Sequence, residues 1–447
     1  MECLNVFIGT ERAGSVHIGN GGKLVFAYEP GYRGPDLSVA MPARIGVCES
    51  EHVVRTWFAG VLPDNEDVRT GMSILMGGGR STFDLLKRYG RDLPGAVQVL
   101  SEGDSQEPTA ADEYVEVSCG QIADRLHRIM DVEAGDAAKT WMKAKERWSL
   151  GGGQPKLALF EQNGAYFECH GAMPSNVIVK PGVQGRKFKH QSLSEGISMR
   201  LAKLAGLPCA DIYMEMFDDV DAIVVRRYDR IMSPDGSVVR VHQEDMCQAM
   251  SVYPDQKYPS EGGPDAGSIM RLLKSSSETT DRMRFFDALV FNYLLAAPDA
   301  HGKNYSLLHF AQGDYCLAPL YDVASIAPYM HARSEFGPGD KKHKAYRCAM
   351  SIGGENQIGR LRKSNIDRFA KLHELDADAL RHRIENIAAK VKGNLEPAVN
   401  EFSGWAGVDE IGSLLVARVS ALCDMTVRNI YLAGNKVRYI DLGEIKG

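Results

Sequence analysis

The feature that most constrains this fold is a glycine-rich loop followed directly by strand-like segments. Ser149–Lys156 reads SLGGGQPK, and the apolar runs Leu157–Phe160 and Ala165–His170 follow it on either side of Gln162-Asn163-Gly164. Asn-Gly between two such runs favours a tight hairpin turn, because both residues tolerate positive φ. The sequence therefore predicts a backbone loop of little bulk that leads into a β-hairpin.

After the hairpin, the pattern continues through a strand that ends in lysine, a helix and two further strands. These segments are Asn176–Lys180, Ser192–Gly206, Asp211–Phe217 and Ala222–Tyr228. Apolar residues that recur every three or four positions indicate the helix, and β-branched runs indicate the strands. This part of the chain is predicted to mix strands and helix.

From residue 242 onward, helical periodicity dominates. We expect helices in Asp281–Ala297, Ile366–Leu375, Ala377–Val391 and Ile411–Leu432, and a short hairpin from Tyr305–His309 and Tyr315–Leu320. The polar stretch Ser101–Asp112 is typical of a linker. A chain of 447 residues is long enough for two or three domains. We expect an N-terminal subdomain over 1–110, a mixed N-lobe over 111–240 and a helical C-lobe over 241–447.

Composition excludes several classes of protein. The net charge is 52 − 58 = −6, so the chain as a whole does not match the charge of nucleic acid, and the basic run 341–344 offers at most a local contact. No apolar run approaches the ~20 residues that span a bilayer, so we expect no membrane association. The nine cysteines are scattered and never spaced C-x-x-C. This argues against a zinc ribbon and a disulfide framework, and favours the cytoplasm.

In this order, the segments match the parts of a protein-kinase-like phosphotransferase. Gly151, Gly152 and Gly153 would let backbone N–H groups approach phosphate oxygens, because glycine has no side chain. Lys180 stands at a strand end, where its amine could neutralise phosphate charge. Glu195 on the following helix is the candidate for holding that lysine in place.

Two carboxylates and an amide would supply the remaining chemistry. Asp299 could accept the proton of an attacking hydroxyl. Asn304 and Asp322 offer the hard oxygen ligands that Mg²⁺ prefers. The interval 304 − 299 = 5 equals that between Asp and Asn in the kinase pattern D-x-x-x-x-N. The conjunction of these parts in one order favours phosphotransfer more than any single motif does.

Each of these residues also has a plainer interpretation. Lys180 could be a solvated strand end, and Asp299 and Asp322 could be ordinary turn residues. Glu195 could complete a capping box with Ser192, which is worth about 1 kcal/mol to a helix. The two interpretations of Glu195 are compatible with each other.

Beyond these motifs, the chain resembles the HipA-type serine/threonine kinases, the toxin halves of bacterial type II toxin–antitoxin pairs. The similarity covers nearly the whole length and lies in Val61–Asp64, Phe83–Leu86, Gly90–Asp92, Ser149–Lys156, Tyr228–Arg230, Gln243–Gln248, Asp299–Ser306 and Leu320–Val323. The most specific combination is QEDMCQ at 243–248 with D-x-H-x-K-N from Asp299, because a generic kinase lacks both.

The resemblance implies an α+β, protein-kinase-like two-lobed fold, with a mixed α/β N-lobe, an all-helical C-lobe and an N-terminal HipA-type extension. ATP and Mg²⁺ would bind between the lobes, with Asp299 as the catalytic residue and Asn304 and Asp322 on the metal. Arg226 departs from the acidic residue expected at its position. The implied nucleotide contacts are Gly151, Gly152, Gly153, Gln154, Pro155, Lys156, Lys180, Arg226, Arg227, Tyr228, Gln243, His301, Gly302, Lys303, Asn304, Tyr321 and Asp322.

By the same resemblance, the protein would transfer the γ-phosphate of ATP to a protein substrate, for example a translation component such as an aminoacyl-tRNA synthetase. Autophosphorylation of Ser149 would switch it off, because a dianion beside the phosphate loop repels ATP. A helix-turn-helix antitoxin protein would be its partner and would make most of the contact with operator DNA.

Two other functions are compatible with the pattern. The first is a catalytically idle co-repressor that binds an antitoxin and operator DNA. An idle scaffold has no physical need for all of Lys180, Asp299, Asn304 and Asp322. The second is a small-molecule kinase on the same scaffold, which would need an enclosed acceptor pocket instead of an open groove.

Overall fold

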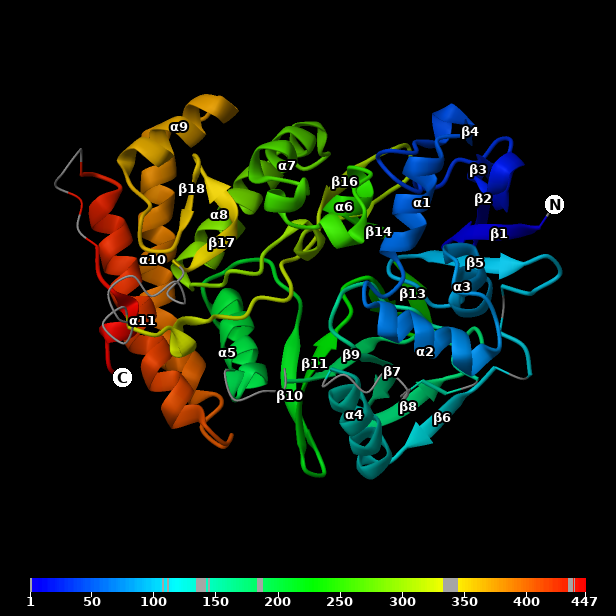
Figure 1. Cartoon of the computed structure of the whole chain (residues 1–447), viewed down its shortest axis with the longest axis horizontal. Helices are drawn as coiled ribbons and strands as arrows, with labels where there is room; N and C mark the ends of the chain where they lie inside the picture. The colour runs from blue at the N-terminus through cyan, green and yellow to red at the C-terminus, as the bar shows by residue number, and fades with distance from the viewer. Residues whose placement is uncertain are drawn as a thin grey trace. The chain divides into compact units, whose positions relative to one another are not determined.

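The chain forms two compact units in the computed structural model (Figure 1). The structure describes residues 2–106, 108–110, 112–133, 142–143, 145–182, 188–332, 345–432, 437 and 439–447. Unit 1 comprises Met1–Gln184, Tyr213–Lys257 and Ser306–Ala318, and unit 2 comprises Gly185–Ile212, Tyr258–Tyr305 and Pro319–Gly447. Each unit is therefore assembled from segments that are distant in the sequence. The basic run 341–344 lies outside the described residues, and the three-part division expected from the sequence stays a prediction.

The N-terminal part of unit 1 is an antiparallel sheet with the strand order β4-β3-β2-β1-β5. In β1 the side chains of Leu4, Val6 and Ile8 are buried, and the residues between them are only partly covered, as the two-residue period of a strand requires. Helix α1 contacts β3 and β4, and α3 contacts β5. The elements are β1 Cys3–Ile8, β2 Glu11–Ile18, η1 Asn20–Gly22, β3 Leu24–Tyr28, η2 Ala43–Ile45, β4 Val47–Cys48, α1 Glu51–Gly60, α2 Glu66–Met76, α3 Thr82–Tyr89 and β5 Val97–Ser101.

A second sheet in unit 1 has the order β10-β11-β9-β7-β8-β6. The hairpin predicted at Asn163-Gly164 is confirmed, and both residues have positive φ (54° and 82°), as a tight hairpin turn requires. Helix α4 contacts β9 and β11. The elements are β6 Tyr114–Val117, α4 Cys119–Glu133, β7 Leu157–Gln162, β8 Ala165–Cys169, β9 Val177–Pro181, β10 Ile212–Phe217 and β11 Val220–Arg226.

One hydrophobic core serves both sheets of unit 1. Its buried side chains run from Val6 in β1 through Trp57 in α1 to Val179 in β9 and Val224 in β11. Leu150 of the glycine-rich loop belongs to the same core. The remaining short elements of unit 1 are β12 Arg230–Met232, β13 Val238–Arg240, β14 Gln243–Asp245, α6 Met246–Ala249, η4 Pro254–Gln256, β15 Ser306–His309 and β16 Tyr315–Leu317.

A buried carboxylate joins β14 to the N-terminal sheet and its helices. Glu244 accepts hydrogen bonds from the Val39 backbone N (2.8 Å) and from Trp57 Nε1 (3.0 Å), and its Oε1 lies 3.0 Å from His309 Nε2. Several partners around one ionised group compensate for its removal from water. Glu244 in the QEDMCQ segment is therefore explained by folding alone.

Unit 2 is mainly helical. Helix α10 contacts α5, α8, α9 and α11, so it forms the centre of the helical packing. The predicted helices are present, and an antiparallel pair, β17–β18, was not predicted. The elements are α5 Gln191–Leu204, η5 Pro259–Glu261, α7 Ala266–Leu272, η6 Leu273–Ser275, α8 Asp281–Leu294, η7 Gly302–Asn304, η8 Ala327–Tyr329, β17 Arg347–Ile352, β18 Glu355–Gln357, α9 Lys363–His373, α10 Ala377–Asn400, α11 Val408–Asn429 and η11 Leu442–Glu444.

The capping box expected for Ser192 and Glu195 is wrong. Helix α5 begins at Gln191, and its N-cap is His190, whose φ of 61° is left-handed and whose side chain makes no cap. Ser192 therefore already has helical geometry and cannot serve as the N-cap. Both Ser192 and Glu195 are buried.

We predict that His242 makes the stability of the protein dependent on pH. Its ring is buried with Nε2 2.9 Å from the Leu37 carbonyl and lies beside His309. Burial, with a smaller contribution from His309, lowers the pKa of His242 from 6.5 to about 3. Between these values the unfolded chain binds a proton that the folded chain excludes, so the free energy of unfolding should fall as pH decreases from about 6.5 towards 3.

The variant His242→Gln can still donate to the Leu37 carbonyl but does not titrate. Thermal melts between pH 7 and pH 4.5 should show a smaller decrease in Tm for this variant than for the wild type. His52→Gln is the control for substituting a histidine, because His52 is exposed. Equal slopes for His242→Gln and the wild type would contradict the prediction.

Candidate functional site

The glycine-rich loop of unit 1 is anchored on the segment that follows α1. The carbonyl of Gly152 accepts a hydrogen bond from the Asp64 backbone N (3.0 Å), and Gly152 forms a parallel bridge with Pro63. Gly152 has a φ of 106°, which side-chain-bearing residues rarely adopt. Gln154 Nε2 donates to the Pro181 carbonyl (3.0 Å) and so ties the loop to the end of β9.

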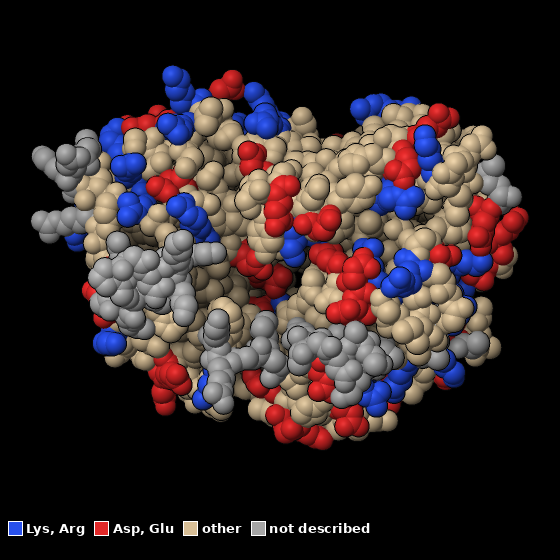
Figure 2. All heavy atoms as spheres, in the orientation of Figure 1, with Lys and Arg blue, Asp and Glu red and all other residues tan. Residues whose placement is uncertain are grey.

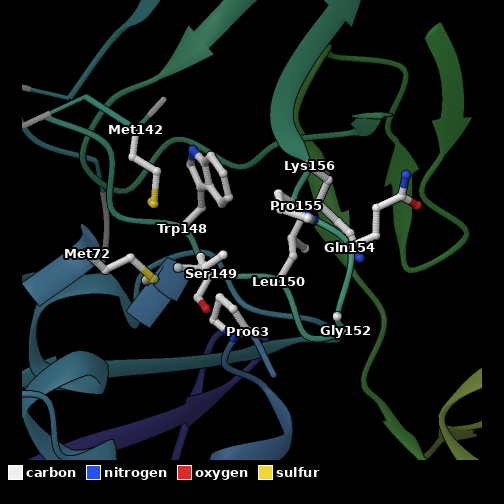
Figure 3. A pocket seen from close by; sticks show the side chains of 12 residues that line it. Pro63, Met72, Met142, Trp148, Ser149, Leu150, Gly152, Gln154, Pro155 and Lys156 are labelled. Atoms are coloured by element: carbon white, nitrogen blue, oxygen red, sulfur yellow. The ribbon is translucent and has the colours of Figure 1, made fainter. Parts of the chain in front are cut away.

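Ser149 lies at the base of this loop and is buried (1% exposed). Its Oγ donates to the Val61 carbonyl (3.1 Å), and its backbone N donates to the Asp92 carbonyl (3.0 Å). Figure 3 shows the pocket beside it, which holds about 310 Å³ including open solvent. Its lining residues are Pro63, Val68, Met72, Met142, Trp148, Ser149, Leu150, Gly152, Gly153, Gln154, Pro155 and Lys156. Ser149 is therefore held in a largely apolar pocket.

Two of the predicted lysines lie near the phosphate-loop candidates: Lys156 is in the loop itself, and Lys180 is in β9. Lys180 is buried (6% exposed) in β9, opposite Ile223 of β11, so the interpretation as a solvated strand end is wrong. Lys156 Nζ donates to the Gly151 carbonyl (3.1 Å) and stays close to the loop backbone. Both amines belong to unit 1, as do the three glycines.

Sequence reasoning missed a third cation, Lys257. Its Nζ lies 3.8 Å from Asp64 Oδ2, and a Cβ built on Gly153 would lie 3.6 Å from the same Nζ. The loop thus has an ammonium group from a segment about 100 residues away. No local pattern marks Lys257, because only the folded chain brings it to the loop.

The side chains of Arg226 and Arg227 are engaged within the protein. Arg226 is exposed, pairs with Glu161 (2.7 Å) and lies over the ring of Tyr213 (5.2 Å to its centroid). The guanidinium of Arg227 is buried and pairs with Asp229 (2.9 Å). A nucleotide contact of these two residues would therefore depend mainly on the main chain.

A buried network of charges surrounds Arg227. Asp92 pairs with Arg230 (2.8 Å) and, at 3.4 Å, with Arg227. Burial raises the pKa of Asp92, but the guanidinium groups of Arg230 and Arg227 outweigh it and hold that pKa well below the usual range. The network joins Asp92, which lies between α3 and β5, to the segment that follows β11.

The same network orients Gln243. Its Nε2 donates to Asp229 Oδ2 (3.1 Å), and its Oε1 accepts a hydrogen bond from the Tyr228 hydroxyl. An amide engaged at both ends has a fixed orientation. The side-chain amide of Gln243 is thus held in one orientation next to the Arg226–Tyr228 segment.

In unit 2, the side chain of Asn304 joins the two candidate aspartates. Its Nδ2 lies 3.1 Å from the Asp299 carbonyl and 3.4 Å from the Asp322 carbonyl. The loop is held further by hydrogen bonds from the His301 backbone N to the Asp299 carbonyl (2.8 Å) and from the Tyr321 hydroxyl to the Lys303 carbonyl (2.6 Å). Residues 299–304 and 321–322 therefore lie together in one constellation.

This constellation fits a magnesium ion. Asp299 and Asp322 are exposed, and Asn304 between them is buried. Because Asn304 donates through Nδ2, its Oδ1 can serve as a ligand beside the Asp322 carboxylate. Mg²⁺ commonly takes one or two protein oxygens and completes its shell with phosphates and water. Asp322 has a φ of 58°, an uncommon value for a residue with a side chain that occurs often at functional sites.

The predicted residues are thus gathered into two groups, one in each unit. Unit 1 holds the glycine loop, Lys180, Gln243 and the Arg226–Tyr228 segment, and unit 2 holds Asp299, His301–Asn304, Tyr321 and Asp322. Glu195 lies in α5 of unit 2. Its ion pair with Lys180 stays a prediction.

Comparisons with known proteins give the family. The family model described as "HipA-like C-terminal domain" matches residues 148–396, and the one described as "HipA N-terminal domain" matches residues 4–100. The chain belongs to the HipA family. Y4mE from Sinorhizobium fredii, which carries the provisional name of a kinase, is 32% identical over 402 residues, covering 87% of this chain and 89% of Y4mE.

A curated HipA sequence and a solved HipA complex extend the comparison. The serine/threonine-protein kinase toxin HipA of Shewanella oneidensis is 28% identical over 344 residues, covering 71% of this chain and 75% of the relative. A chain of the solved Shewanella oneidensis MR-1 complex of HipA, HipB and operator DNA matches with a TM-score of 0.77 at 21% identity, covering 95% of this chain and 99% of that chain.

These comparisons confirm two expectations from the sequence. The chain is a member of the HipA-type kinase family, and its fold is the α+β, protein-kinase-like fold of HipA.

The nine cysteines are free. Within the described ranges, no helix combines the length and hydropathy needed to cross a bilayer, and no cluster of three or more His, Cys, Asp or Glu could hold a metal.

We predict that Asp92 is essential for the stability of this HipA-family chain. Asp92→Ala leaves the buried guanidinium groups of Arg227 and Arg230 short of one carboxylate, which should cost about 3–5 kcal/mol of unfolding free energy. Urea unfolding measures this cost. Glu29→Ala is the matched control, because the Arg12–Glu29 pair is exposed and should contribute less than about 1 kcal/mol. A cost for Asp92→Ala as small as that of the control would refute the prediction.

Proposed function

We propose that this protein is a serine/threonine protein kinase that transfers the γ-phosphate of ATP to a protein substrate. The observation that carries the proposal is the Asn304 amide, which follows Asp299 at the interval of the kinase pattern D-x-x-x-x-N and contacts the carbonyls of both Asp299 and Asp322. Membership of a family whose relatives are named kinases supports it.

Each group would have a separate role. Backbone N–H groups of Gly151–Gly153 and the amines of Lys156, Lys180 and Lys257 would bind the negatively charged phosphates. Gln243 and the main chain of Arg226–Tyr228 would contact the nucleotide base. The loop anchors on Pro63 and Asp64 support this role, because they fix the backbone that would face the phosphates.

In the reaction, the acceptor hydroxyl forms a bond to the γ-phosphorus while the bond between that phosphorus and the β–γ bridging oxygen breaks, and ADP leaves. Asp299 would orient the hydroxyl and take its proton. Asn304 and Asp322 would hold Mg²⁺, which when bound offsets the charge that develops on the phosphate oxygens. His301–Lys303 would complete the nucleotide and metal contacts, with Tyr321 holding the Lys303 carbonyl.

Ser149 would regulate the enzyme through its burial. To reach a γ-phosphate, Ser149 has to lose its hydrogen bond to Val61 and leave the pocket of Figure 3. Once phosphorylated, a dianion would not return among Pro63, Met72 and Trp148, because burying an uncompensated charge is costly. Autophosphorylation would therefore hold the loop away from its ATP-binding position.

The proposed partner is a helix-turn-helix antitoxin protein that would also make most of the contact with operator DNA. The relative's solved complex with HipB and operator DNA supports this part of the proposal. On the face shown in Figure 2, basic and acidic side chains are interspersed, and the net charge is −6. Such a chain suits DNA contact through a partner. The protein substrate would be a translation component, and the reaction would take place in the cytoplasm.

The catalytic role of Asp299 predicts a large loss of rate on substitution. Asp299→Asn should lower incorporation of label from γ-labelled ATP with Mg²⁺ by about 100-fold or more, since general-base catalysis contributes about 10²–10⁴-fold. Asp409→Asn, at an exposed position in the first turn of α11, is the control and should label like the wild type. An Asp299→Asn protein that labels at the wild-type rate would eliminate the proposal.

Regulation by Ser149 predicts a change in ATP affinity with time. After incubation with ATP and Mg²⁺, the wild type should lose most of its affinity for fresh nucleotide in calorimetry, because the loop is displaced. Ser149→Ala should retain its affinity through the same treatment. A wild-type protein shown by mass spectrometry to carry phosphate on Ser149, yet binding ATP fully, would argue against this mechanism.

A further inference from the structure

Tyr258, which no sequence motif marks, forms a hydrogen bond with the candidate base Asp299. The hydroxyl of Tyr258 donates a hydrogen bond to Asp299 Oδ1 at 2.5 Å. Both residues belong to unit 2. The ring of Tyr258 lies edge-on to the ring of His301, with centroids 4.9 Å apart and planes at 89°. One side chain thus contacts two members of the 299–304 loop.

The backbone around Tyr258 is fixed by a tight turn. The Tyr258 carbonyl accepts hydrogen bonds from the backbone N of Glu261 and of Gly263, each at 2.9 Å. Pro259 starts the turn η5, and Gly262 ends it with a left-handed φ of 94°. Because the turn fixes the main chain and His301 fixes the ring, the hydroxyl is held in place before any substrate binds.

The candidate base needs such an orienting group. Asp299 is exposed, and the torsion that turns a carboxylate about its own axis has broad, shallow minima. A freely turning carboxylate presents its oxygens to the acceptor in many directions, and a misplaced reacting group lowers the rate. A fixed donor on one oxygen restricts that rotation and directs the other oxygen.

We propose that Tyr258 is a positioning residue, which holds Asp299 through Oδ1 so that Oδ2 meets the acceptor hydroxyl. The inference rests on the proposed role of Asp299. Burial, together with the hydrogen bond to Asp299 and its charge, raises the pKa of Tyr258. The hydroxyl therefore stays protonated at neutral pH and acts as a donor to the carboxylate, not as a competing base.

The test is Tyr258→Phe, which removes the hydroxyl and keeps the ring against His301. At saturating ATP, the single-turnover rate of Ser149 labelling should fall about 10- to 100-fold, the range of a hydrogen bond to a charged group. The KM for ATP should change less than about twofold, because Tyr258 is proposed to orient Asp299 and not to bind nucleotide. Tyr253→Phe is a matched control, since its ring is also edge-on to a histidine, His52, and its rate should not change.

A double-mutant cycle separates positioning from a merely structural role. In the Asp299→Asn background, Tyr258→Phe should change the residual rate less than about twofold, since no base remains to be oriented. An equal fall in both backgrounds would overturn the inference, as would a wild-type rate, or a faster one, for Tyr258→Phe alone. If Asp299→Asn itself labels like the wild type, the proposed function fails instead. Thermal melts of every variant check that it is folded.

Discussion

The side-chain amide of Asn304 is the contact on which the candidate site depends. Its single nitrogen lies within hydrogen-bond distance of the carbonyls of Asp299 and Asp322, two residues that are otherwise separated by the hairpin β15–β16. A buried amide that satisfies two backbone acceptors fixes both segments at once. Under the proposed function, the two aspartates would act on the same substrate. The left-handed backbone of Asp322 sets the direction of its side chain. Tyr258 adds a second constraint at Asp299, on the carboxylate itself.

Within unit 1, residues near the N-terminus support the structure of the glycine loop. Leu150 shares a core with both sheets, Asp64 donates to Gly152, and the Val61 carbonyl holds the hydroxyl of Ser149. Asp92 reaches the other end of the proposed nucleotide site through Arg227. Under the proposed function, these contacts would couple regulation to catalysis, because the segment that buries Ser149 also shapes the loop. A partner that binds the N-terminal subdomain could then influence phosphate binding without touching the nucleotide.

Local sequence patterns predicted most helices and strands, but they could not predict contacts between residues that are far apart in the sequence. The Asn163-Gly164 turn requires only two residues that tolerate positive φ, and α10 requires only an apolar stripe along one face. Both could therefore be predicted from the local sequence. The spacing of Asp299 and Asn304 is likewise local. By contrast, Lys257 matters because it lies near Gly153, about 100 residues away, and Tyr258 because it contacts Asp299, 41 residues away. The motif at Ser192 failed as a cap because α5 starts two residues earlier than the motif predicts, with His190 in place of Ser192 as the N-cap.

A structure with a non-hydrolysable ATP analogue and Mg²⁺ would test the central claim most directly. The account predicts that the phosphates lie within hydrogen-bond distance of the Lys180 amine and the glycine-loop N–H groups, and that Asn304 and Asp322 hold a magnesium ion. Phosphates that contact none of the glycine-loop N–H groups, or a metal ion away from Asp322, would contradict it.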